Sequence, residues 1–481
     1  MAVEFREVEK LRSAYAAAGQ AHVFTFWKDL PEGQQQLLLD DLRCVHIDQV
    51  PGLAKLARAG ANPTTSTDDL QPAEVIRLED IGVGVREQGE ELLVAGRVAA
   101  FTVAGGQGTR LGFDGPKGAF PISPVKNKPL FQLFAEFILG IQRRYGRPVP
   151  WYIMTSPGND AATRAFFESQ AYFGLAPNGV TFFQQGVIPA FDNEGRILLD
   201  QPHRLALSPD GHGGSLLAMA TSGVLRDMAD RGVEYISYFQ VDNPLVKCLD
   251  PVFLGLHADR GADMSSKTLP KADDLEKVGN FAMSGGRQVV IEYSDLPAAV
   301  ARARNPDGSR KFDAANIAIH VLSRMFVERL TADRSSFALP WHVAKKKVPS
   351  IDLGTGRRIE PAEPNGVKLE AFIFDALPLA KNPVLLATTR EEEFSPVKNQ
   401  AGADSVDTAR RDMSRRAARW LESAGVNVLR GIASETPVVC EISPLAALDA
   451  EHLAERVVSG DVRMSNPEEA AGVFVEAEPC H

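Results

Sequence analysis

Two adjoining stretches decide the fold of this chain: Val98-Ala99-Ala100-Phe101-Thr102-Val103 and, directly after it, Ala104-Gly105-Gly106-Gln107-Gly108-Thr109-Arg110-Leu111-Gly112. The apolar run predicts a buried strand. The glycines that follow leave the backbone almost without side chains, so its N–H groups can approach a negatively charged ligand. A glycine-rich loop at the end of a buried strand is typical of nucleotide binding in a parallel α/β sheet.

The spacing of the loop separates it from two common phosphate-binding motifs. A dinucleotide fingerprint starting at Gly106 would need a third glycine where the chain has Leu111, and a Walker loop needs Gly-Lys-Ser/Thr. A tight structural turn is the alternative interpretation of such a loop. Arg110 and Lys117 place two cations in one short stretch, which favours binding of a phosphorylated ligand.

Composition narrows the class of protein. The chain has 481 residues and a formal net charge of −10, which argues against nonspecific nucleic-acid binding. It contains no apolar run of membrane-spanning length, and its first residues lack the pattern of a secretory signal. The four cysteines are scattered and form no C-x-x-C pair, which predicts a reduced, cytoplasmic setting without a zinc site.

Alternating strand and helix patterns predict an α/β fold. Apolar residues at helical spacing follow Pro129 as far as Gly146, which we expect to end that helix. We expect the main strands at 98–103, 150–155, 181–185, 235–241 and 289–293.

The pattern changes twice along the chain, which predicts three regions. Residues 1–95 read as a helical region, interrupted by a loop at 61–67. Residues 96–385 read as the central α/β domain, and residues 386–481 as a small C-terminal domain containing β-strands.

Two further places carry residues suited to ligand chemistry. Asp242 follows an apolar strand, where α/β sheets bind ligands, and a lone carboxylate suits Mg²⁺; a turn formed by Asp-Asn-Pro is the alternative. His212 lies in the glycine-rich stretch Ser208-Pro209-Asp210-Gly211-His212-Gly213-Gly214, which could equally be a surface turn. A helix starting near Ser215 would point its N-terminus at a ligand there.

Three isolated polar residues allow a binding interpretation or a plain structural one. Glu292 interrupts an apolar strand and could accept hydrogen bonds from ligand hydroxyls, or face solvent on an edge strand. Asn316 lies in an apolar run and needs a partner, either backbone or ligand. Lys398 could reach a phosphate, although exposed lysines usually have no such role.

Taken in order, the motifs resemble the UDP-N-acetylhexosamine pyrophosphorylases, within the wider group of UTP:sugar-1-phosphate uridylyltransferases. The resemblance covers about residues 100 to 450 and is carried by ordered stretches: Ala104 to Gly112, Pro116-Lys117-Gly118, Phe183-Gln184-Gln185-Gly186, Pro209 to Gly214, Val241-Asp242-Asn243-Pro244, Val278-Gly279, Val290-Ile291-Glu292-Tyr293-Ser294, Asn316-Ile317, Lys368 to Asp375 and Glu393 to Asn399. It implies a Rossmann-like mixed sheet of the nucleotidyltransferase type, with an N-terminal helical layer.

The resemblance also implies a role for each matched residue. Uridine and the phosphates of UTP would be bound by Ala104, Gly105, Gly106, Gly108 and Thr109, with Gln185 and Gly211 at the base. Arg110 and Lys117 would bind the triphosphate and the departing pyrophosphate, Asp242 would hold Mg²⁺, and Lys398 would bind the sugar phosphate. The sugar itself would be bound by Gly279, Glu292 and Asn316.

One departure from the family pattern bears on the choice of sugar. Members specific for N-acetylated sugars usually carry Asn where this chain has His212, and the glucose enzymes have a Gly-His-Gly motif there. Glu292 favours N-acetylglucosamine 1-phosphate, whereas His212 favours glucose 1-phosphate as the alternative. A non-catalytic nucleotide-sugar sensor is a third hypothesis, which the combination of Arg110, Lys117, Asp242 and Lys398 disfavours.

Overall fold

A computed structural model describes residues 2–60, 69–333, 339–426, 438–465 and 472–478. The chain forms two compact units, each built from three segments. Unit 1 comprises Met1–Thr65, Gln185–Ala218 and Ser336–Asp375, and unit 2 comprises Ser66–Gln184, Met219–Ser335 and Ala376–His481. The loop predicted at 61–67 and Cys480 lie outside the described residues, and the three-part division by sequence range stays a prediction.

Unit 2 is built on a mixed ten-stranded sheet whose central order is β1-β12-β14-β10-β2-β3-β4. The strands β10, β2, β3 and β4 run parallel, and β14 is antiparallel to β10. The parallel strands are β2 Val98–Val103, β3 Trp151–Thr155, β4 Val180–Gln184 and β10 Tyr235–Gln240. Around β14 Ala314–Ser323 lie β1 Gln71–Pro72, β11 Met264–Pro270, β12 Asn280–Ser284, β13 Arg287–Ile291 and β19 Val384–Ala387.

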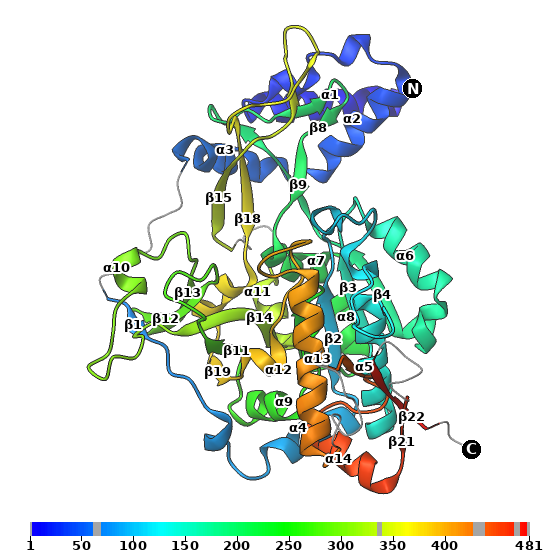
Figure 1. The fold of residues 1–481 in the computed structure, drawn as a ribbon. Helices are drawn as coiled ribbons and strands as arrows, with labels where there is room; N and C mark the ends of the chain where they lie inside the picture. The colour runs from blue at the N-terminus through cyan, green and yellow to red at the C-terminus, as the bar shows by residue number, and fades with distance from the viewer. Residues whose placement is uncertain (1, 61–68, 334–338, 427–437, 466–471, 479–481) are drawn as a thin grey trace. The chain divides into compact units, whose positions relative to one another are not determined.

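Helices cover both faces of this sheet (Figure 1). Side chains alternate along each strand, so Trp151 and Ile153 join the large core that also contains Phe131 of α5 and Phe253 of α9. On the opposite face, the Tyr152 hydroxyl donates to Asp227 of α8 at 2.7 Å. The helices of unit 2 are α4 Val85–Val94, α5 Leu130–Tyr145, α6 Asp160–Ser169, α8 Val224–Asp230, α9 Pro251–Asp259, α10 Ala298–Ala301, α11 Arg324–Leu330 and α12 Arg390–Glu393.

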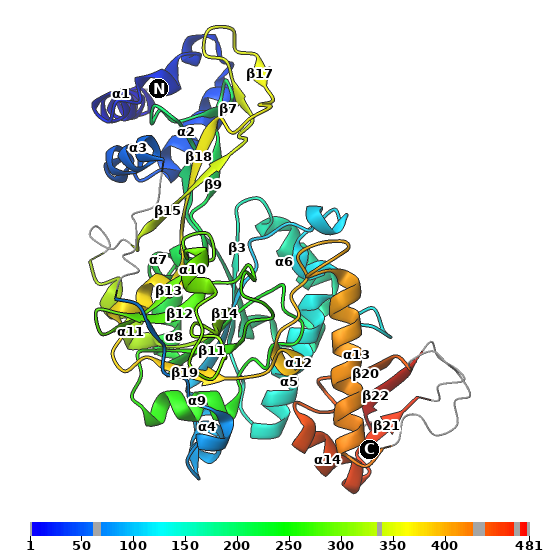
Figure 2. The same cartoon turned by 60° about the vertical axis from the view of Figure 1, so that its left-hand side comes forward.

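The end of the chain adds a small layer to unit 2, visible beside α5 in Figure 2. It consists of α13 Val406–Ser423, β20 Cys440–Ile442, α14 Ala450–Ser459, β21 Val462–Met464 and β22 Val473–Ala477. Ser405 forms a capping box with Thr408 at the start of α13. Trp420, Cys440 and Leu453 lie in the core of this layer.

Unit 1 packs three helices on a short antiparallel sheet, β15-β18-β6. Leu42 and Leu53 share a core with Val367 and Leu369 because the helices have one apolar face each. The main elements are α1 Ala2–Ala17, α2 Glu32–Cys44, α3 Val50–Ala59, β6 Phe191–Asp192, β15 Trp341–Lys346 and β18 Gly366–Ala371. Two-stranded ribbons accompany them: β5 Val187–Pro189 with β9 Leu207–Pro209, β7 Leu199–Gln201 with β8 Arg204–Leu205, and β16 Ser350–Ile351 with β17 Arg358–Ile359.

The predicted α/β fold class is confirmed, and so are its main elements. The helix predicted after Pro129 is α5, and Gly146 ends it in the left-handed conformation at φ 68°. All five strands expected from the apolar runs are present within a few residues of their predicted bounds. In the described part of the chain, no helix is long and apolar enough to cross a membrane.

Candidate active site

The order of the parallel strands places two loops next to each other in unit 2. From β2 the chain continues into β3 and β4 on one side, whereas β10 pairs with β2 on the other. The strand order thus reverses between β2 and β10, and open α/β sheets bind ligands at the carboxyl ends of strands at such a point. Ala104 follows β2 and Asp242 follows β10, and the last residues of the two strands, Val103 and Gln240, lie opposite each other.

The glycine loop after β2 is folded tightly onto itself. The N–H of Gly108 donates to the carbonyl of Gly115 at 2.8 Å, and the N–H of Lys117 donates to the carbonyl of Gly106 at 3.1 Å. A side chain at Gly108 would come within 2.7 Å of the Phe113 ring, so this position requires glycine. Ala104 and Gly108 are buried, whereas Gly106 and Thr109 are exposed and accessible to a ligand.

Lys117 and Asp242 lie together at the end of the sheet. Their side chains approach to 3.8 Å between Nζ and Oδ2, and both are mostly shielded from solvent. The guanidinium of Arg110 donates to Oδ1 of Asn399, the residue after Lys398. Lys398 itself forms an ion pair with Asp404 at 3.4 Å. Unit 2 therefore gathers three cations and the carboxylate of Asp242 from three separate stretches of sequence.

Hydrogen bonds to Asn243 and Asp242 hold the segment that carries Lys398. The N–H of Val397 donates to the carbonyl of Asp242 at 2.8 Å. Nδ2 of Asn243 donates to the carbonyl of Glu393 at 2.7 Å, and its Oδ1 accepts from the N–H of Ser395 at 3.2 Å. Residues 393–399 are therefore fixed beside the end of β10, although they lie about 150 positions further along the chain.

The three residues assigned to the sugar also come together in unit 2. A Cβ at Gly279 would lie 3.2 Å from Oε1 of Glu292 and 3.6 Å from Cβ of Asn316. Gly279 accepts the N–H of Asn316 at 2.8 Å, and Asn316 Oδ1 accepts the N–H of Ala318 at 3.0 Å. Glu292 directly follows the edge strand β13. The structure thus places a carboxylate, a side-chain amide and a bare backbone position at one spot.

Gln185, Gly211 and His212 belong to unit 1. Gln185 is buried. Gly211 adopts a φ of +85°, and a side chain there would come within 2.4 Å of the carbonyl of Ala371, so only glycine fits. The 3₁₀ turn His212–Gly214 then leads into α7 Ser215–Thr221, the helix predicted near Ser215.

Comparison with known proteins identifies the family. A family model described as UTP–glucose-1-phosphate uridylyltransferase matches residues 57–413. The chain belongs to this family. It is 36% identical to the UDP-N-acetylhexosamine pyrophosphorylase-like protein 1 of Xenopus tropicalis, over 94% of this chain and 95% of that protein.

Two further relatives are named as UDP-N-acetylglucosamine pyrophosphorylases. The UDP-N-acetylglucosamine pyrophosphorylase of Saccharomyces cerevisiae is 36% identical, with 92% of this chain and 96% of that protein covered. The crystal structure of the uridine diphosphate N-acetylglucosamine pyrophosphorylase of Trypanosoma brucei, solved with an inhibitor, superposes with a TM-score of 0.77. That match has 27% identity and covers 94% of this chain and 95% of the other.

The structure shows the surroundings of His212, the residue on which the expected choice of sugar depends. Its ring stacks on Phe372 with the centroids 5.2 Å apart. Its Nδ1 accepts the N–H of Ile373 at 3.2 Å, so Nδ1 carries no proton and the neutral ring has its proton on Nε2. Burial, with a smaller contribution from His342, lowers the pKa of His212 to about 4. His212 is therefore neutral at physiological pH and offers one N–H donor.

Asp210 is an unexpected feature of the same loop. Burial raises the pKa of its carboxyl to about 7, and Oδ1 has no hydrogen-bond partner among the described residues. Side chains at Gly186 or Gly214 would collide with this carboxyl at 2.3 and 2.2 Å, so the two glycines make room for it.

Sequence reasoning assigned no role to Asn243, Asn399 or Asp210, although all three lie inside the motifs quoted above. The sequence offered one signal for these residues: each is a polar residue directly beside a residue to which the resemblance gives a role. What each neighbour contacts depends on pairing between distant segments, which a single sequence does not reveal.

The residues near Asp242 fit a magnesium ion that is shared with a phosphorylated substrate. In the described parts of the chain, no group of three or more His, Cys, Asp or Glu side chains could hold a metal by itself. Mg²⁺ commonly uses one or two protein carboxylates and completes its shell with phosphate oxygens and water. A single carboxylate at the end of β10, beside cations suited to phosphates, matches that mode of binding.

Proposed function

We propose that this protein transfers the uridylyl group of UTP to N-acetylglucosamine 1-phosphate and releases pyrophosphate. The supporting observation is the gathering of Arg110, Lys117, Asp242 and Lys398 where the strand order reverses, in a chain of the uridylyltransferase family. These groups have the charges needed to hold a nucleoside triphosphate and a second phosphate side by side.

The reaction requires alignment more than proton transfer. An oxygen of the sugar phosphate attacks the α-phosphorus of UTP and forms a new P–O bond. The bond between the α-phosphorus and the bridging oxygen breaks, and pyrophosphate leaves with that electron pair. The attacking oxygen is already anionic, so the reaction needs no general base; positioning and charge neutralisation provide the catalysis.

Each charged residue has a distinct part in this proposal. Lys117 and Arg110 neutralise the triphosphate and the leaving pyrophosphate, and Lys398 orients the sugar phosphate. Asp242 would hold Mg²⁺, which when bound neutralises charge on the phosphate oxygens. Ala104, Gly105, Gly106, Gly108 and Thr109 hold the nucleotide, as the family resemblance implies.

A pyrophosphate-release assay with UTP and a panel of sugar 1-phosphates tests the function. We expect turnover with N-acetylglucosamine 1-phosphate, and much slower turnover when UTP is replaced by another nucleoside triphosphate. Tight UTP binding without pyrophosphate release from any sugar phosphate would instead support a nucleotide-sugar sensor.

Glucose 1-phosphate is the alternative substrate, and His212 is the observation that favours it. The juxtaposed Gly279, Glu292 and Asn316 support the N-acetylated sugar. The ratio of kcat/KM values for the two sugar phosphates should therefore be compared between the wild type and His212→Asn. An unchanged ratio would remove His212 as a determinant of sugar choice.

The setting we propose is a reducing, cytoplasmic one. Cys44, Cys248 and Cys440 are free thiols, and burial raises the pKa of Cys248 and Cys440, which keeps those thiols protonated and unreactive. Cell fractionation with detection of the native protein checks this assignment.

A further inference from the structure

The turn before α6 holds the carbonyl groups of the glycine loop from one side. Nδ2 of Asn159 donates to the carbonyl of Ala104 at 2.8 Å and to that of Gly106 at 3.1 Å. The hydroxyl of Ser156 has two acceptors within reach, the carbonyl of Gly105 at 2.9 Å and Oδ1 of Asn159 at 3.0 Å. Three consecutive loop carbonyls therefore have side-chain donors from one short turn, which we call the carbonyl clamp (Asn159 and Ser156).

The carbonyl clamp also determines where the N–H groups of the loop point. In a trans peptide the C=O of one residue and the N–H of the next point in opposite directions. Fixing the carbonyls of residues 104–106 therefore turns the N–H groups of Gly105, Gly106 and Gln107 away from α6. Within the described residues, no acceptor takes a hydrogen bond from these three N–H groups.

The clamp is itself held in one orientation. Asn159 is only 1% exposed, and its Oδ1 accepts the N–H of Ser156 at 2.8 Å. Because the amide oxygen is engaged there, the NH₂ group must face the loop. Ser156 directly follows β3, and Met154 of that strand accepts the N–H of Ala104 at 2.8 Å. Both sides of the clamp are thus anchored on neighbouring strands of the sheet.

We propose that Asn159 and Ser156 are positioning residues that present the N–H groups of Gly105, Gly106 and Gln107 to UTP. The inference rests on the proposed function. The ligand atoms these groups suit are oxygen acceptors, either a uracil carbonyl or phosphate oxygens. Without the clamp, glycine would let the loop peptides rotate, and the three N–H groups would no longer be held facing away from α6.

Asn159→Asp is the sharpest test because it changes one atom type. Aspartate keeps the acceptor for Ser156 but loses both donated hydrogen bonds and places negative charge against the carbonyls of Ala104 and Gly106. We expect the Kd for UTP, measured by titration calorimetry, and the KM for UTP to rise about tenfold or more. The KM for the sugar 1-phosphate should not change. Ser156→Ala removes one donor and should have a smaller effect in the same direction.

Asn365→Asp provides the matched control in unit 1. Asn365 also holds backbone through its side-chain amide, donating to the carbonyl of Val348 at 2.9 Å and accepting its N–H at 2.8 Å. Asn365→Asp removes the donated hydrogen bond, so this variant should have a lower Tm and an unchanged Kd for UTP. Asn159→Asp should also be titrated with uridine and, separately, with inorganic tripolyphosphate. Weaker binding of uridine would assign the N–H groups to the base, and weaker binding of tripolyphosphate would assign them to the phosphates. Weaker binding of either probe supports the proposal.

The outcomes separate this inference from the proposed function. A wild-type protein that does not bind UTP overturns the function. A wild type that binds UTP, together with a folded Asn159→Asp variant of equal affinity, overturns only the role of the clamp. If Asn159→Asp does not fold, Ser156→Ala decides: unchanged UTP affinity and unchanged amide chemical shifts of Gly105 and Gly106 contradict the proposal.

Discussion

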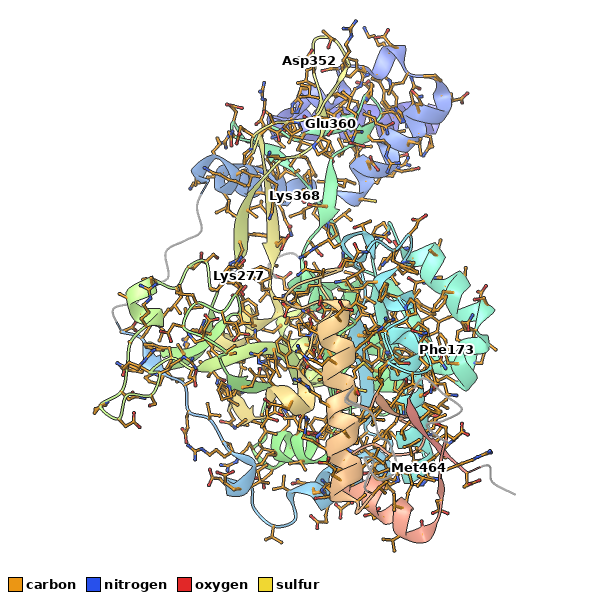
Figure 3. The ribbon with its side chains drawn as sticks, viewed as in Figure 1. Phe173, Lys277, Asp352, Glu360, Lys368 and Met464 are labelled. Carbon is orange, nitrogen blue, oxygen red and sulfur yellow. The ribbon has the colours of Figure 1, made fainter. Side chains whose placement is uncertain are left out.

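Asp242 is the carboxylate on which the proposed chemistry most depends. Asp242→Asn keeps the size of the side chain and removes the charge suited to Mg²⁺. We expect pyrophosphate release to fall by about 100-fold or more, while UTP binding without added metal survives. Asp352→Asn is the control, since Asp352 caps a turn beside Thr355 in unit 1 (Figure 3). Normal turnover in Asp242→Asn would exclude the assigned role.

Asp210 gives a second prediction at this scale, concerning pH and stability. Its pKa is about 7 in the folded protein and 3.8 in an ordinary setting, so the folded state binds the extra proton between these values. Its contribution to stability is therefore unfavourable above pH 7 and disappears below pH 4. An asparagine side chain at this position cannot ionise, so Asp210→Asn should be more stable than the wild type at pH 8, by on the order of 4 kcal/mol.

Urea unfolding at pH 8 and pH 5 checks this prediction, and the gain should shrink at the lower pH. His212 has the opposite sign: with its pKa lowered from 6.5 to about 4, the folded protein loses stability as the pH falls through that window. In Asp210→Asn, the stability that His212 loses at acid pH is no longer offset by the gain from Asp210. Stability should therefore fall more steeply with pH in this variant than in the wild type. An equal gain at both pH values would contradict the raised pKa of Asp210.

Among the structural elements, the glycine loop contains glycines needed for two different reasons. Gly108 is needed for packing, and Gly106 keeps the loop open to a ligand. Gly108→Ala would bring its Cβ within 2.7 Å of Phe113, so we expect a lower Tm. The nearest atom to a Cβ at Gly106 is Cε of Lys117 at 3.9 Å, and Gly106 has an ordinary negative φ. Gly106→Ala should therefore keep the wild-type Tm and weaken UTP binding, because the methyl group occupies the exposed side of the loop.

Differential scanning fluorimetry and calorimetric titration of UTP distinguish the two variants. A Gly106→Ala variant with unaltered affinity would show that the ligand does not approach the loop at that position.

Elements with a strong local pattern could be predicted from the sequence. The helix α5 shows apolar residues at helical spacing between Pro129 and Gly146, and β2 and β10 are short apolar runs. The antiparallel pairing of β14 with β10 and β11 could not be predicted, since it joins segments distant in the sequence. The assembly of unit 1 could not be predicted either, because β18 pairs there with β6, which is also distant in the sequence.

The candidate site shows the same division. The resemblance assigned Gly279, Glu292 and Asn316 to one ligand, and the structure places these residues together, although their roles stay predictions. The carbonyl clamp had no sequence signal, because Asn159 and Ser156 precede a helix like many other polar residues. Their importance arises only where the turn before α6 meets the loop after β2.

At the scale of unit 2 as a whole, a buried charge cluster joins three distant elements. Nζ of Lys267 on β11 lies 2.6 Å from Oδ2 of Asp250, before α9, and 2.6 Å from Oε1 of Glu393, at the end of α12. Lys267 is 1% exposed. Lys267→Met would leave the buried carboxylate of Glu393 and the partly buried one of Asp250 without their cation, so we expect a loss of about 3 to 5 kcal/mol in the free energy of unfolding.

Urea denaturation measures this loss, and Glu393→Gln serves as the comparison. That variant leaves one lysine with one carboxylate, so the smaller imbalance should cost less stability than Lys267→Met. A Lys267→Met variant as stable as the wild type would show that the two carboxylates become protonated or hydrated without cost.

The way the chain passes between its two units has a consequence for its synthesis. The sheet of unit 2 receives β19 only at Val384–Ala387, and unit 1 receives β18 only at Gly366–Ala371. A growing polypeptide on the ribosome therefore cannot complete unit 1 before residue 371 or the sheet of unit 2 before residue 387 has been made. Until then its apolar strand faces stay open to aggregation, and we expect nascent chains of this protein to depend on chaperones that bind early and release late.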